Sequence, residues 1–151
     1  MRNIKLLVVD DERRFLTTAE KILKRQGFEV LTAESGQSAL SQLKTRDVQV
    51  VILDVKMPGM DGLELLSTIK DKAPDTVVVI VSGHGTMESA IRAMRYGSYD
   101  FLQKPINFDR FKILIERIIE KQKLTEENQL IRAACDKHKD KVFFIGTQQR
   151  S

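Results

Sequence analysis

Polar side chains that could do chemistry follow four apolar runs of the sequence, at or just beyond the point where each run ends. These residues are Asp10, Asp11, Asp54, Ser82 and Lys104. Three carboxylates placed together repel one another, and a divalent cation relieves that repulsion. Oxygen ligands without a Cys/His cluster favour Mg²⁺ or Mn²⁺ over zinc. A hydroxyl and an ammonium group suit a phosphoryl group, so the set predicts phosphoryl chemistry beside a metal ion.

Asp54 is the best candidate for a nucleophile in this set. It follows the unbroken apolar run 50–53, which is typical of a strand buried in a parallel sheet. Ligands of such sheets bind just outside the carboxyl ends of the strands. A carboxylate at that place can attack phosphorus and become an acyl phosphate. Each of the other polar residues has an ordinary structural interpretation when taken singly, and it is their combination that favours a site.

Strand-like and helix-like patterns alternate five times along the chain. This alternation predicts a parallel sheet with right-handed crossovers and with helices on both faces. The three most apolar strand patterns belong in the centre, and the weaker ones at 28–32 and 99–102 belong at the edges. We therefore expect an α/β, flavodoxin-like (βα)5 doubly wound fold with strand order 2-1-3-4-5. Its switch point lies between the first and third strands, which end at Asp10, Asp11 and Asp54.

The first helix pattern illustrates how the layers are expected to cover the sheet. It carries Phe15, Ala19, Ile22 and Leu23 at helical spacing, and it ends at Gly27. Glycine is the usual residue just beyond a helix because it tolerates the left-handed conformation found there. We expect the apolar side chains of this helix to face the sheet.

The last predicted element is an extended C-terminal helix. Residues 107–134 contain no helix breaker, and such a helix would be roughly 42 Å long. Its first half offers apolar side chains to the sheet, at Phe111, Ile115 and Ile118. Its second half has the 4-3-4 spacing of a short coiled-coil seam with one polar position, at Leu124, Asn128, Ile131 and Cys135. The pattern predicts dimerisation, with a solvent-exposed helical spacer as the alternative.

Composition excludes several classes of protein. The 151 residues are 42% hydrophobic and 30% charged, as in a globular domain with a short extension. No apolar run approaches the roughly 20 residues that cross a bilayer, and the first residues lead into a strand rather than a signal peptide. A single cysteine fits a reducing compartment. The net charge of +4 is not clustered on one basic face, so we expect no direct nucleic-acid binding. The cysteine usage and the short apolar runs together predict a cytoplasmic chain without membrane binding.

Four motifs form a specific combination over about residues 3–122. They are Val8-Val9-Asp10-Asp11-Glu12, Asp54 with Met57-Pro58-Gly59-Met60-Asp61-Gly62, Ser82-Gly83-His84-Gly85, and Phe101-Leu102-Gln103-Lys104-Pro105. The combination resembles the receiver domain of bacterial two-component response regulators. The resemblance implies that Asp54 accepts a phosphoryl group from a phosphohistidine of a sensor histidine kinase.

The resemblance also assigns roles around the acceptor. Asp11 and Asp54, with the backbone carbonyl of Lys56, would bind Mg²⁺, and Asp10 would help through water. Ser82 and Lys104 would hold the phosphoryl oxygens. Phe101 matches the aromatic switch residue of the family, which moves inward when Ser82 is drawn to the phosphate; it could equally be an edge-strand core residue, and both interpretations can hold. Such a chain is a phosphoacceptor that assists its own phosphorylation and dephosphorylation, not an enzyme with an external substrate.

Further segments are similar to the NtrC-type subfamily, which activates sigma-54 RNA polymerase. They are Gly83–Thr86, Ala90-Ile91, Gly97–Phe101, and Leu124–Arg132, which resembles a linker helix. Val142–Gly146 resembles the first residues of an AAA+ ATPase domain, whereas Thr147–Gln149 departs from that pattern. We expect a receiver domain at 1–122, a linker helix with a short coiled coil at 123–141, and the start of an output domain at 142–151. Neither an ATPase loop nor a DNA-binding motif is expected in this chain.

The favoured hypothesis is a phosphorylation-dependent switch. Phosphorylation of Asp54 would shift an equilibrium at the face built from the fourth helix, last strand and last helix. Homodimerisation through that face and the linker helix would then control a sigma-54-dependent output domain. Alternatives are a receiver domain for another output and an aspartyl-phosphate phosphohydrolase. The phosphohydrolase needs a second aspartate where Lys56 stands and a cap domain for its substrate. A flavin-binding electron carrier shares the fold but needs a hydroxyl- and glycine-rich loop after the first strand, where Asp10-Asp11-Glu12 would instead repel the phosphate of the flavin.

Overall fold

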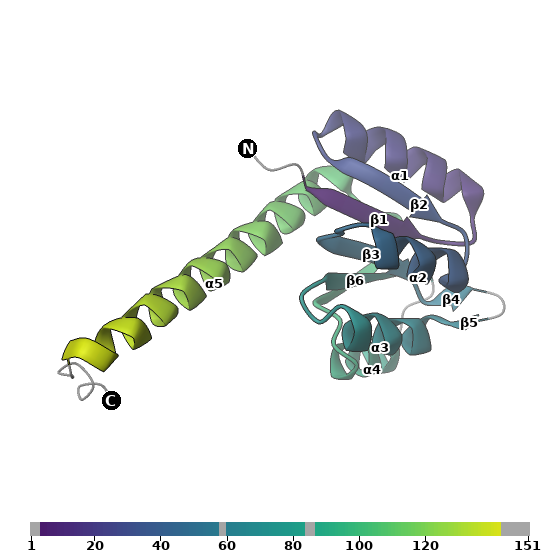
Figure 1. Cartoon of the computed structure of the whole chain (residues 1–151). Helices are drawn as coiled ribbons and strands as arrows, with labels where there is room; N and C mark the ends of the chain where they lie inside the picture. Colours follow the sequence, from purple (N-terminus) through teal and green to yellow (C-terminus); the bar gives the residue numbers. More distant parts are fainter. Residues whose placement is uncertain (1–3, 58–59, 84–86, 143–151) are drawn as a thin grey trace. The chain divides into compact units, whose positions relative to one another are not determined.

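A computed structural model of the chain describes residues 4–57, 60–83 and 87–142. The chain divides into two compact units, Met1–Ile115 and Glu116–Ser151. The first unit holds a parallel sheet covered by helices (Figure 1). Within the described residues, the second unit consists of the continuation of the C-terminal helix.

Five parallel strands form the sheet of the first unit. They are β1 (Lys5–Val9), β2 (Glu29–Ala33), β3 (Val50–Asp54), β6 (Val77–Ser82) and β7 (Asp100–Gln103). Their order is β2-β1-β3-β6-β7, which confirms the predicted order 2-1-3-4-5 and the doubly wound fold. Every residue of β3 is buried, and β1 and β6 are buried except for their first residues. The edge strands β2 and β7 are partly exposed, as their weaker apolar patterns predicted.

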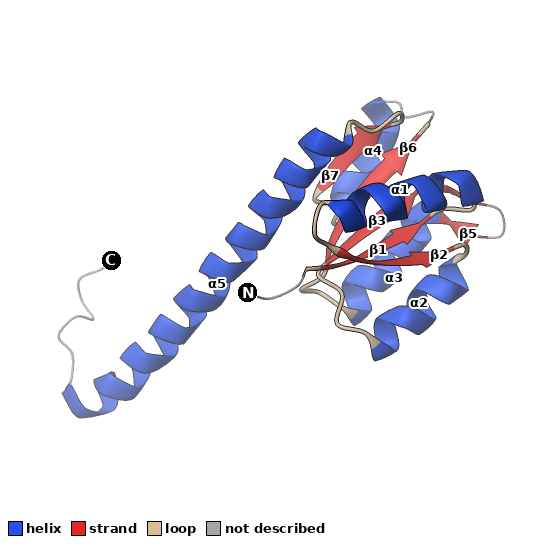
Figure 2. Cartoon of the chain, turned by 90° about the horizontal axis from the view of Figure 1, so that it is seen from above, coloured by secondary structure: helices blue, strands red, loops and turns tan. Residues whose placement is uncertain are grey.

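Five helices follow the strands of this sheet. They are α1 (Arg13–Arg25), α2 (Gly36–Thr45), α3 (Gly62–Lys72), α4 (Met87–Arg95) and α5 (Phe108–Val142). Helix α1 covers one face of the sheet, and α2 and α3 cover the other (Figure 2). Helix α1 ends as predicted, because Gly27 adopts a left-handed backbone with φ of 101°. Its buried residues are Leu16, Ala19 and Leu23, whereas Phe15 and Ile22 are only half-buried.

Helix α5 confirms the predicted extended helix and continues to Val142. Phe111 and Ile115 are buried at its start, as expected. Leu124 and Ile131 are exposed in the single chain, while the side chains of Asn128 and Cys135 lie outside the described residues, as do residues 143–151. The coiled-coil seam therefore stays a prediction. In the described part of the chain, no helix combines the length and the apolar character needed to span a membrane.

A small hairpin that the sequence did not predict follows Asp54. Strands β4 (Lys56–Met57) and β5 (Met60–Asp61) pair antiparallel, and α3 begins directly after them at Gly62. The amide of Gly62 donates a hydrogen bond to the carbonyl oxygen of Val55 at 3.2 Å. A Cβ atom on residue 62 would lie 2.4 Å from Val55 Cα and 2.9 Å from the carbonyl oxygen of Asp54. Only glycine allows α3 to begin this close to the end of β3.

We predict that Gly62→Ala destabilises the fold by roughly 1–3 kcal/mol, because the added methyl group must displace backbone atoms rather than a flexible side chain. Urea unfolding followed by far-UV circular dichroism measures this change.

Gly83→Ala is the matched control, since a Cβ atom at Gly83 has no heavy atom within 4 Å and its φ lies outside the left-handed region. The control should stay within about 0.5 kcal/mol of the native chain or gain slightly in stability. Equal effects of the two substitutions would contradict the close approach at Gly62.

Candidate functional site

The strand register brings the predicted site residues to one edge of the sheet. Val9 of β1 lies opposite Leu53 of β3, so Asp10 and Asp54 follow neighbouring positions. Asp54 lies opposite Val81 of β6, which places Ser82 one residue beyond it. On β7, Gln103 lies opposite Ser82, and Lys104 comes next in the chain. The acidic pair, Asp54, the hydroxyl and the lysine therefore come from four consecutive strands of the sheet.

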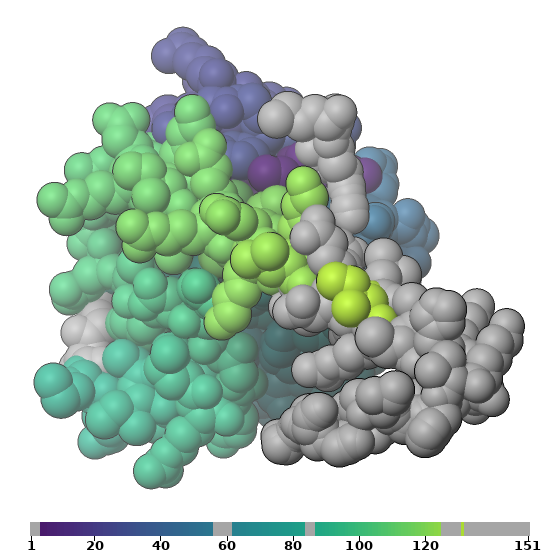
Figure 3. All heavy atoms as spheres, turned by 90° about the vertical axis from the view of Figure 1, so that its left-hand side faces the viewer, coloured from purple at the N-terminus to yellow at the C-terminus, as the bar shows by residue number. Residues whose placement is uncertain are grey.

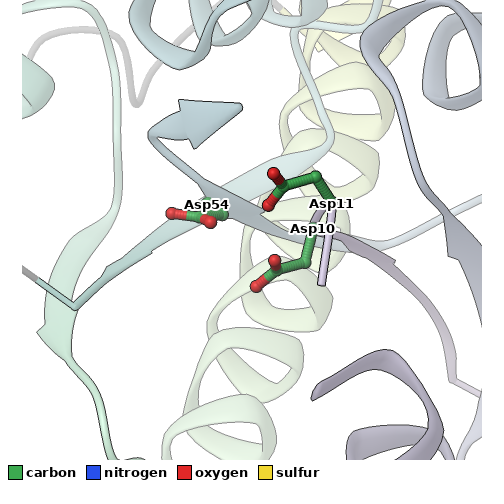
Figure 4. A group of neighbouring side chains, drawn as sticks. All are labelled: Asp10, Asp11 and Asp54. Carbon is green, nitrogen blue, oxygen red and sulfur yellow. The ribbon is translucent and has the colours of Figure 1, made fainter. Parts of the chain in front are cut away.

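Three carboxylates gather where β1 and β3 end (Figure 4). One oxygen each of Asp10, Asp11 and Asp54 lies within 4.8 Å of the others. Asp10 is 1% exposed and Asp54 7% exposed, whereas Asp11 is open to solvent. Such a cluster is electrostatically unfavourable unless a cation lies close to it. The donor set consists of oxygen atoms and has an exposed side, which fits a hard divalent cation that keeps several water ligands.

Asp10 is held firmly at the base of the cluster. Its backbone amide extends the sheet ladder by donating to Ala33 at 3.1 Å. One of its carboxylate oxygens accepts a hydrogen bond from the Glu12 amide at 2.9 Å, and the other accepts one from Lys104 Nζ at 2.6 Å. Both oxygens thus have protein partners, which supports an indirect role for Asp10 toward a metal ion.

Lys104 supplies a positive charge beside the cluster. Its Nζ atom lies 2.6 Å from Asp10, 3.8 Å from Glu12 and 3.9 Å from Oδ2 of Asp54. Its backbone amide donates to the carbonyl oxygen of Ser82 at 2.9 Å, so the lysine is tied to the end of β6 as well. The side chain is 19% exposed, and ion pairs at this depth are screened less by salt than surface pairs.

The remaining predicted residues lie on β6, β7 and β4. Ser82 is buried at the end of β6. Phe101 is half-buried on β7 and packs against the hydrophobic core. The backbone of Lys56 belongs to β4, two residues beyond Asp54, and its side chain lies outside the described residues.

Sequence reasoning missed two neighbours of Lys104. These are Glu12, whose carboxylate lies 3.8 Å from Nζ, and Phe15, whose ring centroid lies 4.2 Å from Nζ. Phe15 was predicted to be a residue of the helix face that packs on the sheet. Its position on the first turn of α1, just beyond the acidic pair, was the one available signal.

Comparison with known proteins gives consistent matches. The family model of the response regulator receiver domain matches residues 6–116. An NtrX-like response regulator of Rickettsia bellii is 42% identical over 130 residues, which are 85% of this chain and 27% of that protein. The chain thus spans about a quarter to a third of the length of the curated relatives it matches.

Solved structures match over the same region. The crystal structure of NtrX from Brucella abortus superimposes with a TM-score of 0.80 at 39% identity, covering 86% of this chain and 30% of that one. The solution structure of the beryllofluoride-activated NtrC4 receiver domain dimer matches with a TM-score of 0.74 at 36% identity, covering 78% of this chain and 98% of that one.

We predict that Asp11→Asn stabilises the metal-free chain by about 0.5–1 kcal/mol, because it removes one of three mutually repelling charges at an exposed position. The same change should reduce the stabilisation produced by MgCl₂, because it removes one of the carboxylates that would hold Mg²⁺ in the folded state. Urea unfolding in EDTA and in MgCl₂ measures both effects.

Asp47→Asn is the matched control for this prediction. Asp47 is exposed and precedes β3, at the opposite end of that strand from the cluster. The control should respond to MgCl₂ as the native chain does. An undiminished Mg²⁺ response in Asp11→Asn would show that Asp11 is not part of a cation site.

Proposed function

Because the chain belongs to the response regulator receiver domain family, we propose that it is a phosphorylation-dependent signalling switch whose phosphoryl acceptor is Asp54. Its relatives are NtrX- and NtrC-type transcription regulators. The observation that carries the proposal is the arrangement at the ends of β1, β3, β6 and β7. There Asp54 lies within 4.8 Å of two further carboxylates and 3.9 Å from the Lys104 ammonium.

The proposed donor is a phosphohistidine of a sensor histidine kinase. A carboxylate oxygen of Asp54 forms a bond to phosphorus while the phosphorus–nitrogen bond to the imidazole breaks. The electron pair of that bond stays on the imidazole, which takes a proton from solvent. Such a transfer depends chiefly on positioning and on neutralising the phosphoryl oxygens. The chain acts in this proposal as a phosphoacceptor that assists its own phosphorylation and dephosphorylation, without an external substrate to turn over.

Two side chains of this chain and a bound metal ion would together neutralise the phosphoryl oxygens. Lys104 already lies near Asp54, and Ser82 ends the neighbouring strand. Asp11, Asp54 and the backbone carbonyl of Lys56 would hold Mg²⁺, with Asp10 helping through water, and the bound ion would offset the charge of the phosphoryl oxygens. With Asp10 as its nearest partner at 2.6 Å, Lys104 has only a short distance to cover to serve a phosphoryl group on Asp54.

The proposed output is a change at the surface formed by α4, β7 and the first turns of α5. Ser82 pairs with β7 through the register Ser82↔Gln103, and Phe101 lies two residues earlier on the same strand. A movement of Ser82 toward a phosphoryl group would therefore reach Phe101, which is half-buried and packs against the hydrophobic core. This coupling is the proposed route from the acceptor to the surface.

The same surface carries exposed apolar side chains that support a homodimer. They are Met87, Ile91 and Met94 on α4, and Ile113 on α5. In Figure 3 the teal side chains of α4 lie below the green side chains of the start of α5 on one face. We propose that phosphorylation shifts dimerisation through this face and through the linker helix that carries Leu124 and Ile131. The dimer would control a sigma-54-dependent output domain or, alternatively, an output of another kind.

We predict that acetyl phosphate with MgCl₂ adds one phosphoryl group to the native chain and none to Asp54→Asn. The physical reason is that the amide of asparagine cannot form the acyl phosphate. Intact-mass spectrometry measures the addition. Asp47→Asn is the matched control and should gain the phosphoryl group normally; a mass gain that survives Asp54→Asn would overturn the acceptor assignment.

We also predict that beryllofluoride with MgCl₂ raises the dimer fraction of the native chain but not that of Ile91→Glu. A buried glutamate would carry an unpaired charge into the interface. Light scattering coupled to size exclusion measures the dimer fraction, with Thr18→Glu on the exposed side of α1 as the control. A scattering profile of the native chain that stays unchanged at saturating beryllofluoride would count against the switch.

A further inference from the structure

We propose that Phe15 is a positioning residue for phosphoryl transfer: its ring holds the Lys104 ammonium beside Asp54 by a cation–π contact. This inference rests on the proposed acceptor role of Asp54. The proposal gives a residue in the first turn of α1 a role in the site, although Phe15 belongs to neither the acidic motif nor the lysine motif.

The ammonium group of Lys104 is enclosed by side chains that hold it in place. Nζ lies 4.2 Å from the centroid of the Phe15 ring, well inside the roughly 6 Å range of a cation–π contact. The carboxylates of Asp10, Glu12 and Asp54 lie at 2.6, 3.8 and 3.9 Å from the same atom. One aromatic face and three carboxylates therefore surround a charge that is largely withdrawn from solvent.

Core packing does not account for the position of the Phe15 ring. The buried residues of α1 are Leu16, Ala19 and Leu23, and Phe15 is only half-buried beside them. The start of α1 is tied to the site, because the Glu12 amide that precedes it donates to Asp10 at 2.9 Å. The helix thus presents the ring to Lys104 from the same loop that supplies the acidic pair.

An aromatic ring suits this task better than another carboxylate would. A carboxylate attracts the ammonium but also repels an incoming phosphoryl group. The ring attracts the ammonium through its quadrupole and adds no net charge. Nζ is within 4.2 Å of the ring and 3.9 Å of Asp54 at the same time, so Lys104 can serve a phosphoryl group on Asp54 without leaving the ring. The contact also restricts the Lys104 side chain before a phosphoryl group arrives. Less rotamer freedom is then lost when the lysine binds that group.

The test compares the initial rate of phosphorylation by acetyl phosphate with MgCl₂ in the native chain, Phe15→Leu and Phe15→Tyr. Leucine keeps an apolar cover but has no ring, and it should slow the rate by about three- to tenfold. Tyrosine keeps the ring and should retain the rate to within about twofold. Phe28→Leu is the matched control, because this buried phenylalanine precedes β2 at the opposite edge of the sheet. It should lower stability without slowing phosphorylation.

A second readout reports the contact itself without any phosphoryl group. In proton NMR spectra of the metal-free chain, the ring current of Phe15 should shift the Lys104 ε-methylene protons upfield. The shift should persist in Phe15→Tyr and vanish in Phe15→Leu. A native rate in Phe15→Leu, or no upfield shift in the native chain, would overturn the positioning role. A clear ring-current shift in a chain that is never phosphorylated would instead show that the acceptor role is wrong, and the positioning role would fall with it.

Discussion

Repulsion among three carboxylates at the switch point of a parallel sheet is the constraint on which the site depends. Adjacent parallel strands end at the same edge, so β1 and β3 necessarily bring Asp10, Asp11 and Asp54 together. Two of these side chains are nearly buried, which weakens solvent screening of their charges. A cluster of this kind needs positive charge. The Lys104 ammonium, 2.6 Å from Asp10 and 3.9 Å from Asp54, provides it in the chain itself. In the proposed switch, a bound divalent cation would add to it.

The ion pair between Lys104 and Asp10 connects the carboxylate cluster to the strands on the other side of the sheet. Lys104 follows β7, and its backbone is bonded to Ser82 at the end of β6. In the proposed switch, a change of charge at Asp54 would therefore act on the two strands that border the surface of α4 and α5. The central strands are rigidly buried, whereas β7 is an edge strand with half-buried residues. In the proposed switch, movement would occur at β7, which contacts α4, and α4 carries exposed apolar side chains.

Close approaches explain which parts of the site were predicted and which were not. The carboxylates, Ser82 and Lys104 were expected together because each follows an apolar run, and parallel pairing aligns the ends of such runs. The hairpin of β4 and β5 escaped prediction because its strands are two residues long and carry no alternation. The need for glycine at position 62 depends on a backbone distance to Val55, and the role of Phe15 depends on where a lysine 89 residues away places its ammonium.

The amino-acid sequence by itself determined the parallel sheet, its strand order, the long last helix and the set of polar residues at the strand ends. These features arise from local hydrophobic periodicity and from the short list of ways in which alternating strands and helices can pack. Only the tertiary structure decided that Lys104 pairs most closely with Asp10, that Phe15 turns its ring to that lysine, and that Gly62 lies against the backbone behind Asp54. Those contacts join residues distant in the sequence or depend on distances of a few ångströms, and no local pattern encodes such distances.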